Sequence, residues 1–161
     1  CTPMVEGYAK AKAAGFPEDW QNDYPCYENP KTSVPILATG KPGTYPIVAD
    51  LVHKSGGDFV AFDEQYLIDM AKLVAYETTV RIGPAAAVCV GGFFESLQKG
   101  LLKNGDDVLI NLGEGSRRAP AFVEDIIYTT KNVASVDDCE KFDRSKYEQI
   151  LWNNILKIYN L

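Results

Sequence analysis

The chain has 161 residues, 46% of them hydrophobic, which suffices for one sizeable core in the usual size range of a single domain. Its 16 Lys and Arg residues against 22 Asp and Glu residues give a formal net charge of -6. This acidic balance argues against binding to nucleic acid or to a membrane surface, because both need a basic surface.

The first part of the chain alternates helical and extended patterns. A helical stretch over residues 8–14 ends at Gly15, and the residues after it, rich in Pro, Tyr and Asn, indicate a loop. Residues 34–38 are expected to form a strand. A helix should follow, with its apolar residues at helical spacing and a stop at Gly56-Gly57; these residues are Ile47, Val48, Leu51 and Val52.

The second part repeats this alternation. Residues 59–62 and 79–82 have the pattern of short strands, and Asp63 is a good N-cap for a helix between them, whose buried stripe is Leu67, Met70, Ala71 and Val74. Pro84 suits the first turn of the next helix, which should continue to residue 97 and end at Lys99-Gly100. Gly91-Gly92 inside this helix indicates close packing against a neighbouring element.

The remaining elements are a strand and a long helix. Residues 108–112 have the clearest pattern of a buried strand, and residues 143–159 that of the clearest long helix. Strands separated by helices of this length imply right-handed crossovers. We therefore expect an α/β fold, with a largely parallel sheet flanked by helices and a binding crevice beyond the carboxyl ends of the strands.

The cysteines predict neither a metal site nor a disulfide framework. All four are widely spaced, and only His53 could supplement them as a ligand. Cys89, between Val88 and Val90, is expected to be buried. The start Cys1-Thr2-Pro3 lacks the regions of a signal peptide, and no apolar run is long enough to cross a membrane, so we expect a cytoplasmic protein.

Two strand ends point to a shared site. Residues 79–82 run directly into Gly83-Pro84-Ala85-Ala86, and residues 108–112 end at Leu112, before Gly113-Glu114-Gly115. Glycine and other small residues at such ends let the backbone approach a flat, anionic ligand. A glycine pair after a strand is also compatible with an ordinary tight turn.

These two turns resemble the cofactor-binding turns of pyridoxal-phosphate enzymes of fold type II. The turn at residues 83–86 resembles their strand-to-helix turn, and the turn at residues 112–115 is similar to their Thr-Gly-x-Gly loop; the resemblance is closest to threonine synthase and cysteate synthase. Thr2-Pro3-Met4 is also similar to a stretch of these enzymes, as is the order of elements from residues 38–40 to residues 63–64. The resemblance covers about residues 1–118 and implies a three-layer fold and pyridoxal phosphate as cofactor.

The resemblance also implies that part of the enzyme lies elsewhere. The family's Schiff-base lysine and its Ser-x-Gly-Asn phosphate loop precede the segments matched here, and neither pattern occurs in this chain. We therefore expect a C-terminal fragment that is inactive alone, contains no catalytic residue and pairs with the N-terminal half of the same enzyme, with a homodimer as a further possibility. Residues 1–118 would belong to the catalytic region, and residues 119–161 would be a helical extension of the same domain.

By the resemblance, the cofactor would contact Gly83, Pro84, Ala85, Ala86, Leu112, Gly113, Glu114 and Gly115. Arg117 or Arg118 stands near the family's lysine after the loop and would bind an anionic substrate, although the pair also fits a solvated turn. Leu112 replaces the threonine that faces the pyridine nitrogen, and a leucine cannot form that hydrogen bond.

The resemblance implies a reaction on an O-phospho amino acid, in which phosphate is eliminated and water or sulfite is added. Gly83 stands where threonine synthase usually has an acidic residue. This departure and Leu112 favour the cysteate synthase type. They are equally compatible with a second hypothesis, a degenerate and non-catalytic module that binds a ligand or a partner.

Overall fold

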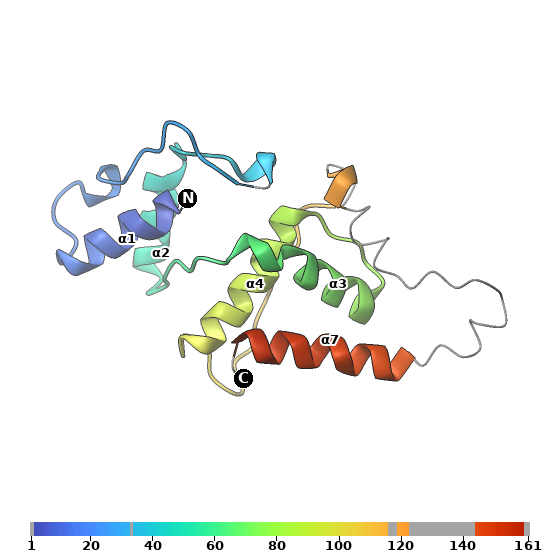
Figure 1. Cartoon of the computed structure of the whole chain (residues 1–161). Helices are drawn as coiled ribbons and strands as arrows, with labels where there is room; N and C mark the ends of the chain where they lie inside the picture. The colour runs from blue at the N-terminus through green and yellow to red at the C-terminus, as the bar shows by residue number, and fades with distance from the viewer. Residues whose placement is uncertain (1, 33, 116–118, 123–143, 160–161) are drawn as a thin grey trace. The chain divides into compact units, whose positions relative to one another are not determined.

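The computed structural model describes residues 2–32, 34–115, 119–122 and 144–159 (Figure 1). The chain divides into two compact units, Cys1–Ala61 and Phe62–Leu161, which are described separately. Predicted residues Arg117 and Arg118, and most of the expected extension over residues 119–161, lie outside the described residues.

The first unit contains the two helices that the sequence predicted, but the first begins at Pro3 and not near residue 8. Helix α1 (Pro3–Ala13) begins with a proline, whose missing N–H needs no partner there, and Gly15 follows its end with φ of 73°. Helix α2 (Tyr45–Lys54) ends in a similar way, because Gly56 has φ of 71° and the Gly57 N–H donates to the Val52 carbonyl at 2.8 Å.

The core of this unit is aromatic. Helices α1 and α2 pack against each other and against the short 3-10 helix η1 (Trp20–Asn22). The buried residues are Tyr8, Ala11, Trp20, Tyr45 and Ala49, and the partly buried ones packed on them are Met4, Phe16, Tyr24, Val52 and Phe59. Trp20, in the segment expected to be a loop, thus contributes to this core.

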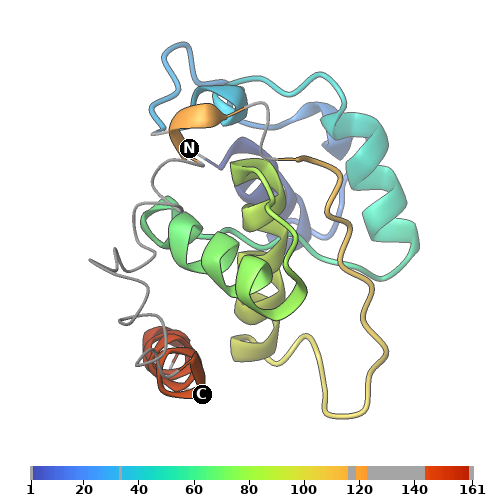
Figure 2. The same cartoon turned by 90° about the vertical axis from the view of Figure 1, so that its right-hand side faces the viewer.

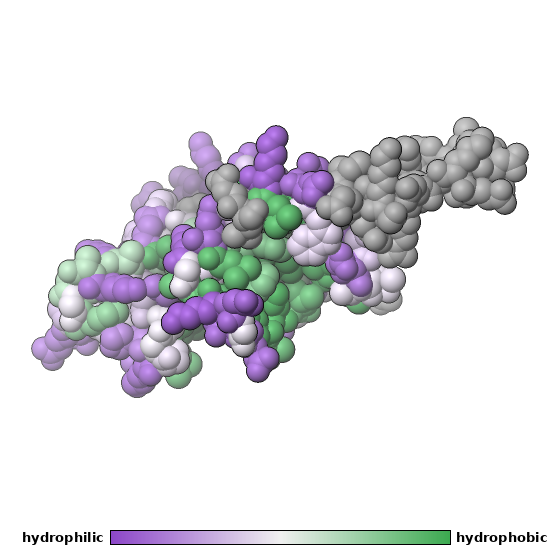
Figure 3. Space-filling model, turned by 90° about the horizontal axis from the view of Figure 1, so that it is seen from below, coloured by the Kyte–Doolittle hydropathy of each residue, from purple (hydrophilic) through white to green (hydrophobic). Residues whose placement is uncertain are grey.

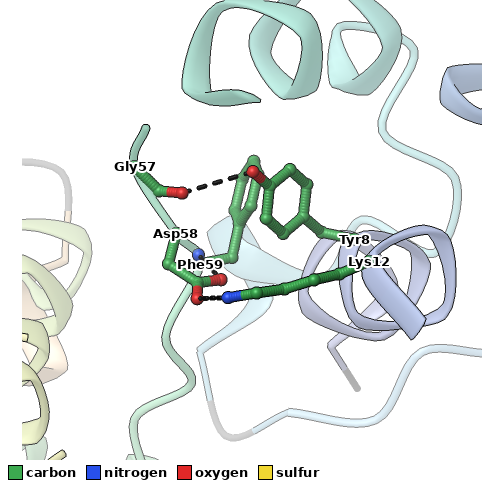
Figure 4. A network of polar contacts seen from close by, with 5 residues as sticks. All are labelled: Tyr8, Lys12, Gly57, Asp58 and Phe59. Carbon is green, nitrogen blue, oxygen red and sulfur yellow. Dashed lines mark hydrogen bonds and ion pairs between the residues drawn. The ribbon is translucent and has the colours of Figure 1, made fainter. Parts of the chain in front are cut away.

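Polar contacts tie α1 to the segment that follows α2 (Figure 4). The Tyr8 hydroxyl donates to the Gly57 carbonyl at 3.2 Å, and the Lys12 ammonium pairs with the Asp58 carboxylate at 2.6 Å. The Tyr8 ring also lies 5.0 Å from the Phe59 ring, between centroids. One face of α1 thus holds the chain as it leaves α2.

The strand expected over residues 34–38 was wrong. The 3-10 helix η2 (Pro35–Leu37) occupies this segment, with Pro35 at its first position. Proline cannot donate to a sheet ladder, and its fixed φ suits the first turn of a helix.

The Tyr45 side chain is 0% exposed. Its hydroxyl has no hydrogen-bond partner among the described residues. We expect Tyr45→Phe to raise the free energy of unfolding by about 1 kcal/mol at neutral pH, because it removes an unpaired buried polar group. Urea denaturation measures this. Tyr27→Phe is the control: the Tyr27 hydroxyl already donates to the Glu6 carboxylate at 2.6 Å, so its loss should bring no gain.

The same burial predicts a pH dependence. Desolvation raises the pKa of Tyr45 above its ordinary value of 10.0. The stability that depends on neutral Tyr45 is therefore complete below that value and is lost as the pH rises from the unfolded pKa to the folded one. Above a pH of about 10, the free energy of unfolding should fall less steeply with rising pH in Tyr45→Phe than in the unsubstituted chain. Equal slopes would show that Tyr45 is not buried.

The described residues of the second unit include three long helices and one helical turn at residues 120–122. Asp63 caps the 3-10 helix η3 (Glu64–Tyr66) by accepting from the Gln65 N–H at 3.1 Å, and η3 leads directly into α3 (Leu67–Thr78). This confirms the predicted cap. Helix α4 (Pro84–Gln98) ends in a Schellman motif, in which Gly100 has φ of 68° and Leu101 N–H donates to the Ser96 carbonyl at 2.9 Å.

The core of the second unit lies between α3, α4 and α7 (Arg144–Tyr159), which contact one another pairwise (Figures 1 and 2). The Phe94 and Tyr159 rings stack at 5.3 Å, and the Trp152 indole N–H donates to Glu77 at 2.7 Å. The buried apolar residues are Leu67, Met70, Ala71, Leu73, Val74, Ile82, Ala86, Ala87, Val90, Phe94, Ile155 and Tyr159. The predicted close packing of the glycine pair is confirmed at Gly91, which lies against the Phe62 ring.

Cys89 is exposed, which corrects the expectation that it is buried. Helix α4 is apolar around much of its circumference, so the pattern alone did not fix its buried face. That face carries Ala86, Val90 and Phe94, and Cys89 lies outside it.

The segments with strand patterns form no strand within the described residues. Their one ladder contact there is an isolated antiparallel bridge between Ile82 and Gly115. Leu109 is 94% exposed, and residues 107–113 make no backbone–backbone hydrogen bond to another described residue. A sheet that would bury residues 108–112 stays a prediction.

Candidate functional site

The two glycine turns meet at the start of α4. The Ile82–Gly115 bridge brings them together, and the Gly83 N–H donates to the Glu114 carbonyl at 3.2 Å. Pro84, the first residue of α4, is fully buried directly after this contact. The structure thus places four of the predicted residues side by side: Gly83, Ala85, Glu114 and Gly115.

The Glu114 side chain caps α4. Its Oε2 accepts from the Ala85 N–H at 2.6 Å, one of the N–H groups that a helix start leaves without an intrahelical partner. Gly83 occupies the N-cap position and has no side chain to do this. A carboxylate at this place is also favoured by the positive end of the helix dipole.

The missing side chain of Gly83 lets the Glu114 carboxylate approach the start of α4. A Cβ on Gly83 would lie 2.7 Å from both Glu114 Cδ and Oε2, closer than real Cβ atoms come to other atoms. The Gly83 backbone is extended, with φ of -88°, so its conformation does not require glycine. Steric space for Glu114 is therefore the local reason for this glycine.

The second oxygen of Glu114 is buried and unpaired. Oε1 has no hydrogen-bond partner among the described residues, in contrast to Oε2 of the same carboxylate. Such an acceptor costs free energy unless a donor reaches it. The site can therefore accept one hydrogen bond from a donor that the described residues do not supply.

The other predicted residues are placed differently. Ala86 is buried in the α3–α4 core, Leu112 is 38% exposed, and Gly113 has open space around it apart from Asn111 Oδ1 at 3.7 Å. No contact within the described part of the chain brings Leu112 to the start of α4.

Sequence reasoning included Glu114 in the second turn but missed its role as the cap of α4. A signal was present, because a helix that begins with Gly-Pro has no side-chain cap of its own and needs an acceptor from elsewhere. The sequence did not say which acceptor, since Glu114 lies 29 residues from Ala85.

Two further findings concern the described residues only. Among them, no group of three or more His, Cys, Asp or Glu side chains is arranged to hold a metal ion. Their helices are all too short or too polar to cross a membrane.

The chain has two curated relatives of note. It is 25% identical over 122 residues to threonine synthase of Methanocaldococcus jannaschii, a match that covers 75% of this chain and 28% of the relative. It is 30% identical over 107 residues to cysteate synthase of Methanothrix thermoacetophila, covering 66% of this chain and 23% of the relative. The chain thus spans about a quarter of the length of the curated relatives that it matches.

No family model matches the chain, and no solved structure is significantly similar to it. The similarity to threonine synthase and cysteate synthase is therefore distant and partial, and it extends over about 70% of the chain.

Proposed function

We propose that this chain is the C-terminal part of a cytoplasmic, pyridoxal-phosphate-dependent synthase of the threonine synthase and cysteate synthase type. The full protein would eliminate phosphate from an O-phospho amino acid and then add water or sulfite. The observation that carries the proposal is the similarity to these two enzymes over 75% and 66% of the chain.

The start of α4 fits one edge of pyridoxal phosphate. The unpaired, buried Oε1 of Glu114 suits a hydrogen-bond donor, and a protonated pyridine nitrogen is one. The cofactor's phosphate does not fit here, because the Glu114 carboxylate already occupies the positive end of α4 and repels a second anion.

When bound, pyridoxal phosphate supplies an electron sink for the bond changes at the substrate's α-carbon. Of the residues expected to contact the cofactor, those that meet at the start of α4 would line the back of the pocket that holds the ring: Gly83, Ala85, Glu114 and Gly115. Pro84, which is buried, would close this side of the proposed pocket to water. Arg117 or Arg118 would bind the anionic group of the substrate.

The proposed partner of this chain is the N-terminal half of the same enzyme, which would supply the Schiff-base lysine. Exposed apolar residues of the second unit support this proposal. Covering them with a partner would remove apolar surface from water, which lowers the free energy. They are Val80, Leu101, Val108, Leu109, Leu112 and Leu156. Figure 3 shows hydrophobic residues, drawn green, at the surface of one face of the molecule. An extended apolar segment such as residues 108–112 is suited to pair with a neighbouring strand.

A non-catalytic module is the second candidate. Leu112 favours it, because this side chain cannot hydrogen-bond the ring nitrogen as the threonine of the family's loop would. Both candidates predict that this chain alone has no activity, so they differ only when the lysine-bearing part is present.

The first test uses the 161-residue chain alone. Mixed with pyridoxal phosphate and reduced with borohydride, it should show no stoichiometric label on any one lysine, because the chain lacks the family's Schiff-base lysine motif. Peptide mapping by mass spectrometry measures this. A single fully labelled lysine, such as Lys99 or Lys103, would overturn the fragment proposal.

The second test asks which reaction the full-length protein catalyses. We expect faster phosphate release from O-phosphoserine with sulfite than from O-phosphohomoserine with water. A β-replacement needs only Cα deprotonation and an anionic nucleophile, whereas the threonine synthase reaction also requires proton transfer at Cβ. Side-by-side assays of phosphate release decide this. Threonine formation without cysteate would reverse the order, and no release from either substrate would favour the non-catalytic module.

A further inference from the structure

Three buried side-chain polar atoms lack a hydrogen-bond partner among the described residues: Tyr45 Oη, Glu114 Oε1 and Tyr159 Oη. The two hydroxyls can be left unpaired at modest cost, since each is neutral. A carboxylate oxygen is different, because it can only accept and is costly to bury without a donor. Glu114 Oε1 is therefore the atom that most needs a partner from outside the described residues.

The geometry of Glu114 fixes where that partner must be. Oε2 is held by the Ala85 N–H at 2.6 Å, and the backbone on either side of the side chain is held by the Gly83 N–H and by the Ile82–Gly115 bridge. The carboxylate therefore cannot turn Oε1 toward solvent without giving up the cap of α4. A donor has to come to Oε1.

The chemistry of the donor follows from the charge. A carboxylate at this position repels phosphate and carboxylate groups and attracts a cationic N–H. A protonated ring nitrogen fits best, because it is a cationic N–H that gives one hydrogen bond, the number that the unpaired Oε1 lacks.

We infer that Glu114 accepts a hydrogen bond from the protonated ring nitrogen of pyridoxal phosphate. It would thereby make the contact with the ring nitrogen that Leu112, which has no polar side-chain atom, cannot make. This inference rests on the proposed function. It assigns the contact to a residue two positions further along the turn, on a side chain that approaches α4 only because Gly83 has no Cβ. Holding the proton on the ring nitrogen makes the ring a stronger electron sink.

The test is made on the full-length protein, loaded with pyridoxal phosphate that carries a nitrogen-15 label in the ring. Nitrogen NMR reports directly whether this nitrogen is protonated. We expect the protonated signal at neutral pH in the unsubstituted protein and its loss in Glu114→Gln. Glutamine keeps an oxygen for the Ala85 N–H and adds an amide donor, which stabilises an unprotonated ring nitrogen.

Two variants separate this role from a structural one. Glu114→Asp keeps the charge and should retain part of the protonated signal. Asp107→Asn removes an exposed carboxylate from the same segment and should leave the signal unchanged. Loss of signal in Asp107→Asn as in Glu114→Gln would show a general charge effect and overturn the inference.

The outcomes distinguish the inference from the proposed function. If the unsubstituted protein binds the cofactor but its ring nitrogen is unprotonated, the role of Glu114 is overturned and the proposed function stands. This measurement does not depend on the folding of any variant. If the ring nitrogen stays protonated in Glu114→Gln, the role of Glu114 is likewise overturned and the proposed function stands. No binding of pyridoxal phosphate to the full-length protein overturns both.

Discussion

Gly91→Ala is expected to lower the free energy of unfolding of the second unit by about 2 kcal/mol, within the range for overpacked cores. A Cβ at this position would overlap the Phe62 ring, with Cγ, Cδ2 and Cε2 as the nearest atoms. A ring cannot yield as the end of a flexible side chain can. The overlap must therefore outweigh the gain of about 1 kcal/mol that alanine brings over glycine inside a helix.

Urea denaturation of the purified chain measures this effect. Gly43→Ala is the matched control, because nothing lies within 4 Å of its Cβ position. Combining Gly91→Ala with Phe62→Ala should recover much of the loss caused by the first change, since the second removes the ring. Stabilisation by Gly91→Ala alone would mean that α4 does not pack on Phe62.

The ends of the helices and the start of α4 could be predicted from the sequence because their causes are local, whereas α1 begins at Pro3 and not near residue 8 as expected. Pro84 starts α4 and Gly100 ends it, and each does so through its own backbone. Asp63 accepts from an N–H only two residues away. Signals of this kind lie within one turn of the residue that they affect.

Features that depend on distant residues could not be predicted. The buried face of α4 depends on where α3 and α7 pack, so the exposure of Cys89 was missed. The sequence indicated that the turns after residues 82 and 112 share a site, but not that the Glu114 side chain fills the space beside Gly83. The strand over residues 34–38 failed for a local reason that was visible, namely Pro35.

Gly83→Ala is expected to destabilise the second unit by about 1–2 kcal/mol, the usual cost of losing a helix cap. Its Cβ would lie 2.7 Å from Glu114 Oε2 and would displace the oxygen that accepts from the Ala85 N–H. Backbone strain does not contribute, because φ of -88° at Gly83 suits any residue. Gly115→Ala, with nothing within 4 Å of its Cβ position, is the control and should cost less than about 0.5 kcal/mol.

A double-mutant cycle with Glu114→Ala tests the cause of this loss, since it isolates the coupling between neighbouring residues. Glu114→Ala alone should cost a similar amount to Gly83→Ala, because both remove the same cap. Once Glu114 is alanine, Gly83→Ala has neither a clash nor a cap left to disturb, and its further cost should fall close to zero. Denaturation of the four proteins in urea gives the coupling, and fully additive losses would show that the Glu114 carboxylate does not lie beside Gly83 at the start of α4.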